Sequence, residues 1–287
     1  KKKLRFILND LKVEKQIAKD ILRNHLSSGT FNALRVAKQV VDIARKTEAK
    51  FVVTTYEGHA WERLVYYYAK KNNLIIKCFG YQHASVSEHQ HAIKRPLSKE
   101  YNPDIILTSG LVSHSIFGKI EKIESSVLCL GSPKYSISRA ISIKSDCCLV
   151  ATQGEVVECL ALFEFSLVYA QQHQKQRFIW RVHPIIDFAQ LQKHSDIFDN
   201  LPDNIYLSKD SLEEDIQKCD SILYRGTTVV VNAINAGLKP IYYQKCIGEL
   251  SVDPIYTQHL GKFVVSNRRE LNFALEKRVD LEARQNL

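Results

Sequence analysis

Short runs of apolar residues alternate along the chain with longer stretches in which apolar side chains recur every three or four positions. In the first half, the short runs predict strands at residues 4–8, 51–55, 74–81, 105–108 and 127–130. The stretches between them predict helices at residues 13–22, 31–46, 60–71 and 111–120. Residues 84–101 interrupt the alternation with a polar, histidine-bearing segment that is too long for a simple connector.

The second half repeats the alternation after a stretch, up to residue 145, that has no clear period. Its apolar runs predict strands at residues 147–151, 177–182, 205–207, 221–224, 240–243 and 263–265. Helices are predicted at residues 155–172 and 212–218, from Thr227 or Thr228, and from about residue 268. Strands that alternate with helices are typical of parallel sheets covered by helices. We therefore predict an α/β protein with two Rossmann-like domains, residues 1–135 and 136–287, facing a cleft.

Residues 221–243 form the most complete strand–helix–strand pattern in the sequence. The turn between the first strand and the helix supplies a cation, a close backbone approach and two hydroxyl groups, from Arg225, Gly226, Thr227 and Thr228. A helix amino end beside such groups suits a phosphate or a carboxylate. The alternative, to which the pattern alone gives equal weight, is that the threonines cap the helix and the arginine is solvated.

Polar residues and glycines directly follow several of the predicted strands. In open parallel sheets, ligands bind beyond the carboxyl ends of the strands, so these positions are the candidate site. They include Glu57, Gly58, His59, Gln82, His83, Ser109, Gly110, Gln153, Gly154, His183, Pro184 and the 225–228 turn. Strand-to-helix loops are commonly polar, so one such residue means little by itself. The occurrence of polar residues and glycines after six predicted strands carries more weight.

The composition is that of an ordinary globular protein, with 45% hydrophobic and 25% charged residues. No apolar run approaches the roughly 20 residues that a membrane span needs, and no secretory signal is visible. The seven cysteines lie mostly in apolar runs and form no CxxC pair, which favours reduced core thiols in a cytoplasmic protein and argues against a zinc site. The net charge of +9 suits an anionic partner, but no basic tract is interleaved with aromatic residues, so nucleic acid is not expected.

Several short motifs resemble those of bacterial transferases that use CMP-activated acidic sugars. Arg-Val-His-Pro at residues 181–184 and Tyr-Arg-Gly-Thr-Thr-Val at residues 224–229 resemble the His-Pro and Ser-Ser/Thr motifs of sialyl- and polysialyltransferases, β-Kdo transferases and CDP-glycerol polymerases. Tyr-Glu-Gly at residues 56–58 resembles the acidic motif of the sialyltransferases. Glu-Gly-His-Ala-Trp-Glu at residues 57–62, with Tyr-Gln-His at residues 81–83, resembles surface carbohydrate biosynthesis proteins.

This resemblance implies a GT-B fold, with a truncated first domain because the chain is short. It also implies transfer of a Kdo- or sialic-acid-like sugar from a CMP-linked donor to a capsule, lipopolysaccharide or lipid-linked glycan acceptor. The donor-binding residues would then be Gln153, Gly154, His183, Pro184, Arg225, Gly226, Thr227 and Thr228. No Asp-x-Asp pair is present, so neither a metal nor a cofactor is expected.

In such a reaction, a base must accept the proton of the attacking hydroxyl group. Glu57 is the first candidate, although a carboxylate there could instead only complement the helix dipole. His83 is a second candidate base and His59 a third. His59, Glu62 and Gln82 are predicted to contact the acceptor.

Two other functions are compatible with the same pattern. A nucleotide-sugar epimerase would share the fold and would act without an acceptor. A non-catalytic scaffold of a polysaccharide assembly complex is favoured by two departures from the motifs, Tyr56 in place of an acid and Arg225-Gly226 in place of a serine. The leading interpretation remains a cytoplasmic transferase whose basic surface lies against the inner membrane.

Overall fold

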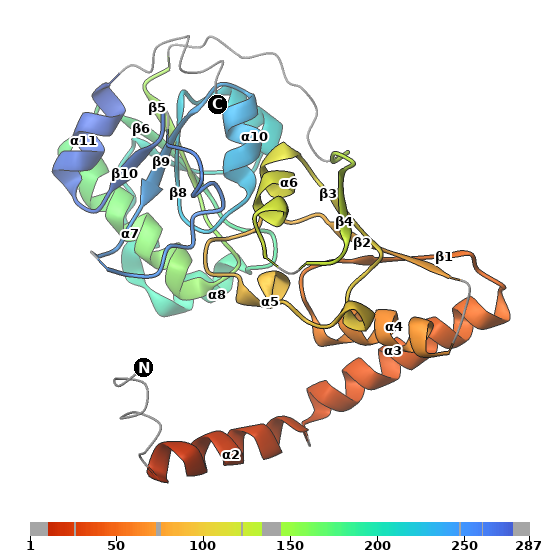
Figure 1. Cartoon of the computed structure of the whole chain (residues 1–287). Helices are drawn as coiled ribbons and strands as arrows, with labels where there is room; N and C mark the ends of the chain where they lie inside the picture. Colours follow the sequence, from red (N-terminus) through yellow and green to blue (C-terminus); the bar gives the residue numbers. More distant parts are fainter. Residues whose placement is uncertain are drawn as a thin grey trace, which may run out of the picture. The chain divides into compact units, whose positions relative to one another are not determined.

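The computed structural model describes residues 11–25, 27–72, 76–121, 123–133, 145–246, 248–259 and 261–277. These fall into two compact units (Figure 1). The first comprises Lys1–Ala84 and Gln90–Ser132, and the second comprises Ser85–His89 and Pro133–Leu287. The strand predicted at residues 4–8 and the boundary predicted between residues 135 and 136 lie outside the described residues.

The first unit contains a four-stranded parallel sheet in the order β1-β2-β3-β4. Its strands are β1 (Phe51–Thr55), β2 (Lys77–Gln82), β3 (Ile105–Thr108) and β4 (Ser126–Cys129). Its helices are α2 (Leu11–His25), α3 (Ser28–Lys46), α4 (Ala60–Lys71), α5 (His91–Lys94), the 3-10 turn η1 (Lys99–Tyr101) and α6 (Leu111–Gly118). Alternate residues of β1 are buried, as a strand covered on one face requires.

The second unit contains a six-stranded parallel sheet in the order β7-β6-β5-β8-β9-β10. Its strands are β5 (Cys147–Ala151), β6 (Arg177–Arg181), β7 (Ile205–Leu207), β8 (Ser221–Tyr224), β9 (Lys239–Tyr243) and β10 (Phe263–Val265). Its helices are α7 (Val156–Gln172), α8 (Phe188–His194), the 3-10 turn η2 (Asp196–Phe198), α9 (Leu212–Gln217), α10 (Val229–Asn235) and α11 (Arg268–Glu276). Counted along the chain, this is the 3-2-1-4-5-6 order of a doubly wound dinucleotide-binding fold.

Helices cover both faces of the second sheet, which explains why every residue of β5 and β8 is buried and why all of them but Ser221 are apolar. On one face, Trp180 stacks on Phe163 with ring centroids 4.4 Å apart, in a core that also includes residues of α8 and α11. On the other face, a second core joins Leu149 and Ile222 to α9 and α10. Successive residues of the inner strands β5, β6, β8 and β9 contribute to these two cores alternately, whereas Tyr206 of β7 and Val264 of β10 are exposed.

The predicted class, an α/β protein with two parallel Rossmann-like sheets, is confirmed. The described part of the first unit has four strands against six in the second. The polar segment at residues 84–101 includes α5 and η1, which the sequence did not reveal because each has fewer than five residues. Five of the seven cysteines are buried and all are free thiols, while Cys129 and Cys246 are exposed.

Candidate functional site

The strand order of the second unit indicates where along the edge of the sheet a ligand would bind. From β5 the chain proceeds outward on one side through β6 and β7, and then returns to β8 on the other side of β5. The helices that follow β5 and β8 lie on opposite faces of the sheet. In doubly wound folds, ligands bind beyond the carboxyl ends of two such strands. Paired as Ala151 with Tyr224, the strands release residues 152–154 and 225–228 side by side.

Three loops meet at this edge of the sheet. The Thr152 hydroxyl accepts a hydrogen bond from the His183 amide at 3.1 Å. A methyl group built on Gly154 would lie 3.5 Å from the His183 Nδ1 atom. The side chain of Gln153 lies directly over Gly226, so that any side chain at position 226 would overlap it. The structure thus brings together Gln153, Gly154, His183 and Gly226, which the sequence predicted for one site.

The His183 ring is oriented by its own loop. Its Nδ1 atom accepts a hydrogen bond from the Ile185 amide at 3.3 Å, so in the neutral ring the Nε2 atom carries the proton. The ring is partly exposed, and the adjacent Pro184 is exposed. His183 can therefore donate a hydrogen bond from Nε2 to an anionic or carbonyl oxygen at this edge.

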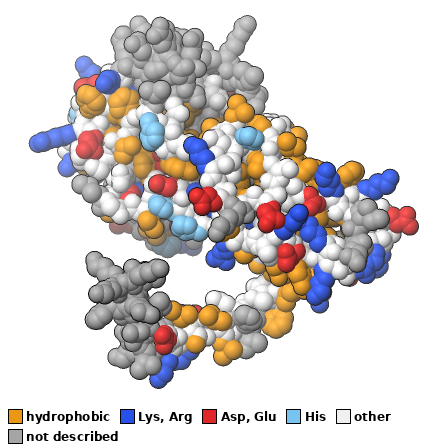
Figure 2. Space-filling model, viewed as in Figure 1, with side chains coloured by type: hydrophobic (Ala, Val, Ile, Leu, Met, Phe, Trp, Pro, Cys, Tyr) orange, Lys and Arg blue, Asp and Glu red, His pale blue; other side chains and the backbone are white. Residues whose placement is uncertain are grey.

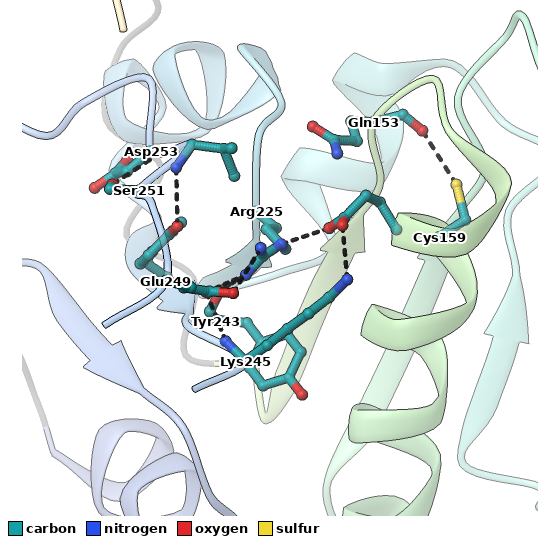
Figure 3. A network of polar contacts seen from close by, with 11 residues as sticks. Gln153, Cys159, Arg225, Tyr243, Lys245, Glu249, Ser251 and Asp253 are labelled. Carbon is teal, nitrogen blue, oxygen red and sulfur yellow. Dashed lines mark hydrogen bonds and ion pairs between the residues drawn. The ribbon is translucent and has the colours of Figure 1, made fainter. Parts of the chain in front are cut away.

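Arg225 points away from solvent into a network of carboxylates (Figure 3). Its Nη1 and Nη2 atoms donate to the two oxygens of Glu249 at 2.6 and 3.0 Å, and its Nε atom donates to Glu158. Lys245 contributes a second cation, 2.6 Å from the other oxygen of Glu158. Burial disfavours the charge of Arg225, but the hydrogen bonds that it donates to Glu249 and Glu158, together with their negative charge, outweigh this effect and raise the pKa of the guanidinium.

This network defines the charge of the site. The side chain of Arg225 is only 7% exposed, and both cations are committed to internal carboxylates. The sequence pattern did not single out three of the four members, Glu158, Lys245 and Glu249. Glu158 and Glu249 lie 67 and 24 residues from Arg225 along the chain, and Lys245 lies on a different loop. The one available signal was Glu158, a carboxylate in the first turn of a long helix.

The two threonines of the 225–228 turn differ in their surroundings. Thr227 is buried, and its hydroxyl accepts a hydrogen bond from the Val229 amide at 3.4 Å, where α10 begins. Thr228 is exposed, and its side chain makes no capping bond. The hydroxyl of Thr228 is therefore the more accessible of the two to a ligand.

In the first unit, Glu57 lies between two imidazole rings. Its Oε1 atom is 3.1 Å from Nε2 of His83, and its Oε2 atom is 3.0 Å from Nε2 of His59. The carboxylate is 28% exposed, so solvent still reaches it. Tyr56, which occupies the place of an acid in the sialyltransferase motif, is a core residue whose hydroxyl accepts a hydrogen bond from Arg63.

Glu62 determines the shape of the loop that carries Glu57. Its fully buried carboxylate accepts hydrogen bonds from three consecutive backbone amides, those of Glu57, Gly58 and His59, at 2.9 to 3.0 Å. It also accepts the Thr55 hydroxyl at 2.7 Å. These bonds satisfy amide groups that the start of α4 would otherwise leave unpaired, and Glu62 would contact an acceptor only by giving some of them up.

Gln82 is similarly engaged. It is buried, its side-chain amide donates to the Ala84 carbonyl, and its oxygen accepts from the Ser109 amide and hydroxyl at 3.3 Å. Gln82 thereby connects the loops that follow β2 and β3. Of the five residues predicted as a base or an acceptor contact in the first unit, Glu57, His59 and His83 keep partly exposed side chains, whereas Glu62 and Gln82 are buried.

No group of three or more His, Cys, Asp or Glu side chains is placed to hold a metal ion within the described ranges. Over the same ranges, no helix is both long and apolar enough to cross a bilayer.

Comparisons with known proteins identify the fold. No protein-family profile and no curated protein matches the sequence. The glycotransferase of kitacinnamycin matches in structure with a TM-score of 0.58 and 10% identity, covering 90% of this chain and 74% of that one. UDP-N-acetylglucosamine 2-epimerase from Rickettsia bellii matches with a TM-score of 0.52 and 14% identity, covering 88% and 70%. The glycosyltransferase SnogD from Streptomyces nogalater gives 0.51 and 17%, covering 91% and 74%.

The chain has a GT-B-like fold. At these identities the likeness concerns the fold alone. The structures that share this fold include two glycosyltransferases and a sugar-nucleotide epimerase. The GT-B architecture expected from the motifs is therefore confirmed. The CMP-linked donor expected from the same motifs finds no support in these likenesses.

Proposed function

We propose that this GT-B-like protein is a metal-independent glycosyltransferase. It moves a Kdo- or sialic-acid-like sugar from a CMP-linked donor to a cell-surface polysaccharide or a lipid-linked glycan. The observation that carries the proposal is the meeting of Gln153, Gly154, His183 and Gly226 at the switch point between β5 and β8. This is where a doubly wound sheet binds nucleotides.

The charge of the site supports a donor with one phosphate. Arg225 and Lys245 are neutralised by Glu158 and Glu249, which leaves neutral hydrogen-bond donors to face a ligand. A leaving nucleoside monophosphate carries less charge than a diphosphate and needs less compensation. We assign the phosphate to the Nε2–H group of His183 and the hydroxyl of Thr228.

Arg225 acts on the donor indirectly in this proposal. Its bonds to Glu249 and to the Tyr243 carbonyl, the latter at 3.1 Å, hold the segment after β9 against the end of β8. That segment brings Val252 to 3.6 Å from a methyl group built on Gly226. Arg225 therefore positions the wall of the nucleotide site.

Glu57 is the proposed base. The acceptor oxygen attacks the anomeric carbon, the bond from that carbon to the phosphate oxygen breaks, and the acceptor proton moves to the Glu57 carboxylate. His59 and His83 hold the two carboxylate oxygens in place. The nucleoside monophosphate leaves with the bonding electron pair, so no cofactor takes part.

Thermal-shift measurements with CMP, CDP, UDP and GDP test the donor assignment. A ligand that binds only the native state raises the melting temperature by mass action. We expect CMP to stabilise the protein, and His183→Ala to abolish the shift while the melting temperature without ligand stays close to that of the wild type. Stabilisation by UDP alone would overturn the CMP assignment and favour the diphosphate-linked sugars of related folds.

Turnover measurements separate transfer from epimerisation. We expect Glu57→Gln to lower the turnover number at least a hundredfold, because it removes the base, and to leave CMP affinity unchanged. Glu100→Gln, at an exposed position of η1, is the matched control. Isomerisation of a free nucleotide sugar without an acceptor would identify an epimerase, and full transfer activity in Glu57→Gln would exclude Glu57 as the base.

A further inference from the structure

The amino-terminal part of the chain concentrates its positive charge. Residues 1–24 contain eight Lys and Arg against three Asp and Glu, a net charge of +5 out of +9 for the whole chain. Within α2, the residues Lys15, Lys19 and Arg23 follow one another at intervals of four. Such spacing brings their side chains onto one side of a helix.

Apolar side chains occupy the neighbouring side of the same helix. Ile17 and Ile21 follow one another at an interval of four, and Leu22 lies at the border with the basic row, three residues after Lys19. Ile17 and Leu22 are 45% and 64% exposed, Ile21 is also exposed, and at the start of α3 Phe31 is 59% exposed. Figure 2 shows hydrophobic side chains at the surface along α2. Every residue from position 14 to position 24 is exposed, so α2 contributes little to a core.

We propose that α2 is an interfacial helix that binds an anionic lipid surface. A helix with exposed large apolar residues beside a basic row inserts the apolar side into the headgroup region, while the cations contact anionic lipids. The concentration of charge distinguishes this from association with a second copy, which would bring like charges together. The inference does not depend on the proposed transferase activity.

Sedimentation of the full chain with lipid vesicles tests this proposal. We expect binding to vesicles of phosphatidylglycerol and phosphatidylcholine in a 3:7 ratio, at least tenfold tighter than to phosphatidylcholine alone, and weakened by salt. Ile17→Glu with Leu22→Glu should reduce binding at least tenfold. Lys15→Glu with Lys19→Glu should abolish the preference for the anionic lipid.

Val264→Glu with Tyr206→Glu is the control for the Ile17 and Leu22 pair, since these residues are 50% and 54% exposed on β10 and β7 and two glutamates there add the same charge elsewhere. The circular dichroism spectrum and the melting temperature of each variant, measured on the same samples, verify that the chain remains folded. Equal binding to both kinds of vesicle, or no binding to either, would overturn the proposal. Conversion of an oligomer to a monomer by the Ile17 and Leu22 substitutions, without a change in vesicle binding, would assign the surface to a second copy.

Discussion

The side-chain oxygen of Gln153 lies so close to Gly226 that a methyl group at position 226 would overlap it. In Gly226→Ala, the flexible Gln153 side chain must rotate away, which costs less than about 1 kcal/mol of folding free energy. If Gln153 belongs to the nucleotide site, the same rotation lowers CMP affinity about tenfold, equivalent to ~1.4 kcal/mol. Isothermal titration calorimetry measures the affinity, and urea denaturation measures the stability.

Gly110→Ala is the matched control for this substitution. Gly110 also follows a strand, β3, but a methyl group there would meet nothing within 4 Å. It should change neither CMP affinity nor stability by a measurable amount. Unchanged affinity in Gly226→Ala would remove Gln153 from the site.

The Arg225 network should make a large contribution to stability. Arg225→Ala leaves Glu158 and Glu249 without their main partner in a poorly solvated position, and we expect a loss of about 3 to 5 kcal/mol in the free energy of unfolding. Arg181→Ala, which breaks one ion pair with Asp215, gives a comparison at the neighbouring strand. A loss below about 1 kcal/mol in Arg225→Ala would show that water already screens the network.

The same network predicts a dependence on pH. Burial opposes ionisation of Glu249, but the hydrogen bonds from Arg225 and from the Lys245 amide outweigh it and lower the pKa of Glu249 below its ordinary value of 4.5. A lowered pKa in the folded state contributes stability above pH 4.5 that is lost as the pH falls below that value. The stability difference between wild type and Glu249→Gln should therefore shrink from pH 7 to pH 3.5 in urea titrations. A constant difference would contradict the lowered pKa.

Gly58 and Gly131 allow backbone strain to be separated from steric overlap. Both have positive φ, 86° and 89°, but a methyl group on Gly58 would overlap the backbone of Ala92 and Ile93, whereas one on Gly131 would meet nothing within 4 Å. Gly131→Ala should cost about 1 to 2 kcal/mol of folding free energy for the left-handed backbone. Gly58→Ala should cost about 3 to 5 kcal/mol, because the overlap is added. Equal losses of folding free energy in the two variants, measured by urea denaturation, would mean that the backbone at Ala92 shifts to accommodate the methyl group at little energetic cost.

Thiol reactivity should follow burial. Burial of the side chain raises the pKa of Cys148 to about 12, so almost no thiolate is present at pH 8. In the native protein, iodoacetamide should alkylate the exposed Cys129 and Cys246 and leave Cys148 unmodified. In urea, mass spectrometry should find all seven cysteines alkylated. Rapid labelling of native Cys148 would contradict its place in the core.

The parts of the fold that depend on local pattern could be predicted from the sequence. All residues of strands β5 and β8 but Ser221 are apolar, because both faces of the sheet are covered there. Gly237, with φ of 90°, ends α10 where a stop was expected. The strand order was not predicted, because it depends on which strands pair and not on any local signal. The short elements α5 and η1 were missed for a different reason: a helix of fewer than two turns is too short to show a hydrophobic period.

The candidate site was predicted in its loops but not in its partners. The sequence pointed to Arg225 as a phosphate ligand, yet the position of its side chain is determined by Glu158, 67 residues away, and by Glu249. Glu62 and Gln82 were predicted to contact an acceptor, and in the structure they hold backbone groups of neighbouring loops. Long-range carboxylates and buried amides leave no periodic trace in a sequence, so only coordinates reveal their roles.

The doubly wound order of the second sheet also has a consequence for engineering. Its six strands and two cores are complete without residues 152–154, 183–185 and 225–228, which emerge at a single rim. Exchanging residues 152–154 and 183–185 for the matching segments of another GT-B-like protein, with Arg225 and its carboxylate partners retained, should leave the supporting framework intact. Under the proposed function, chimeras of this kind would alter which activated sugar the protein accepts.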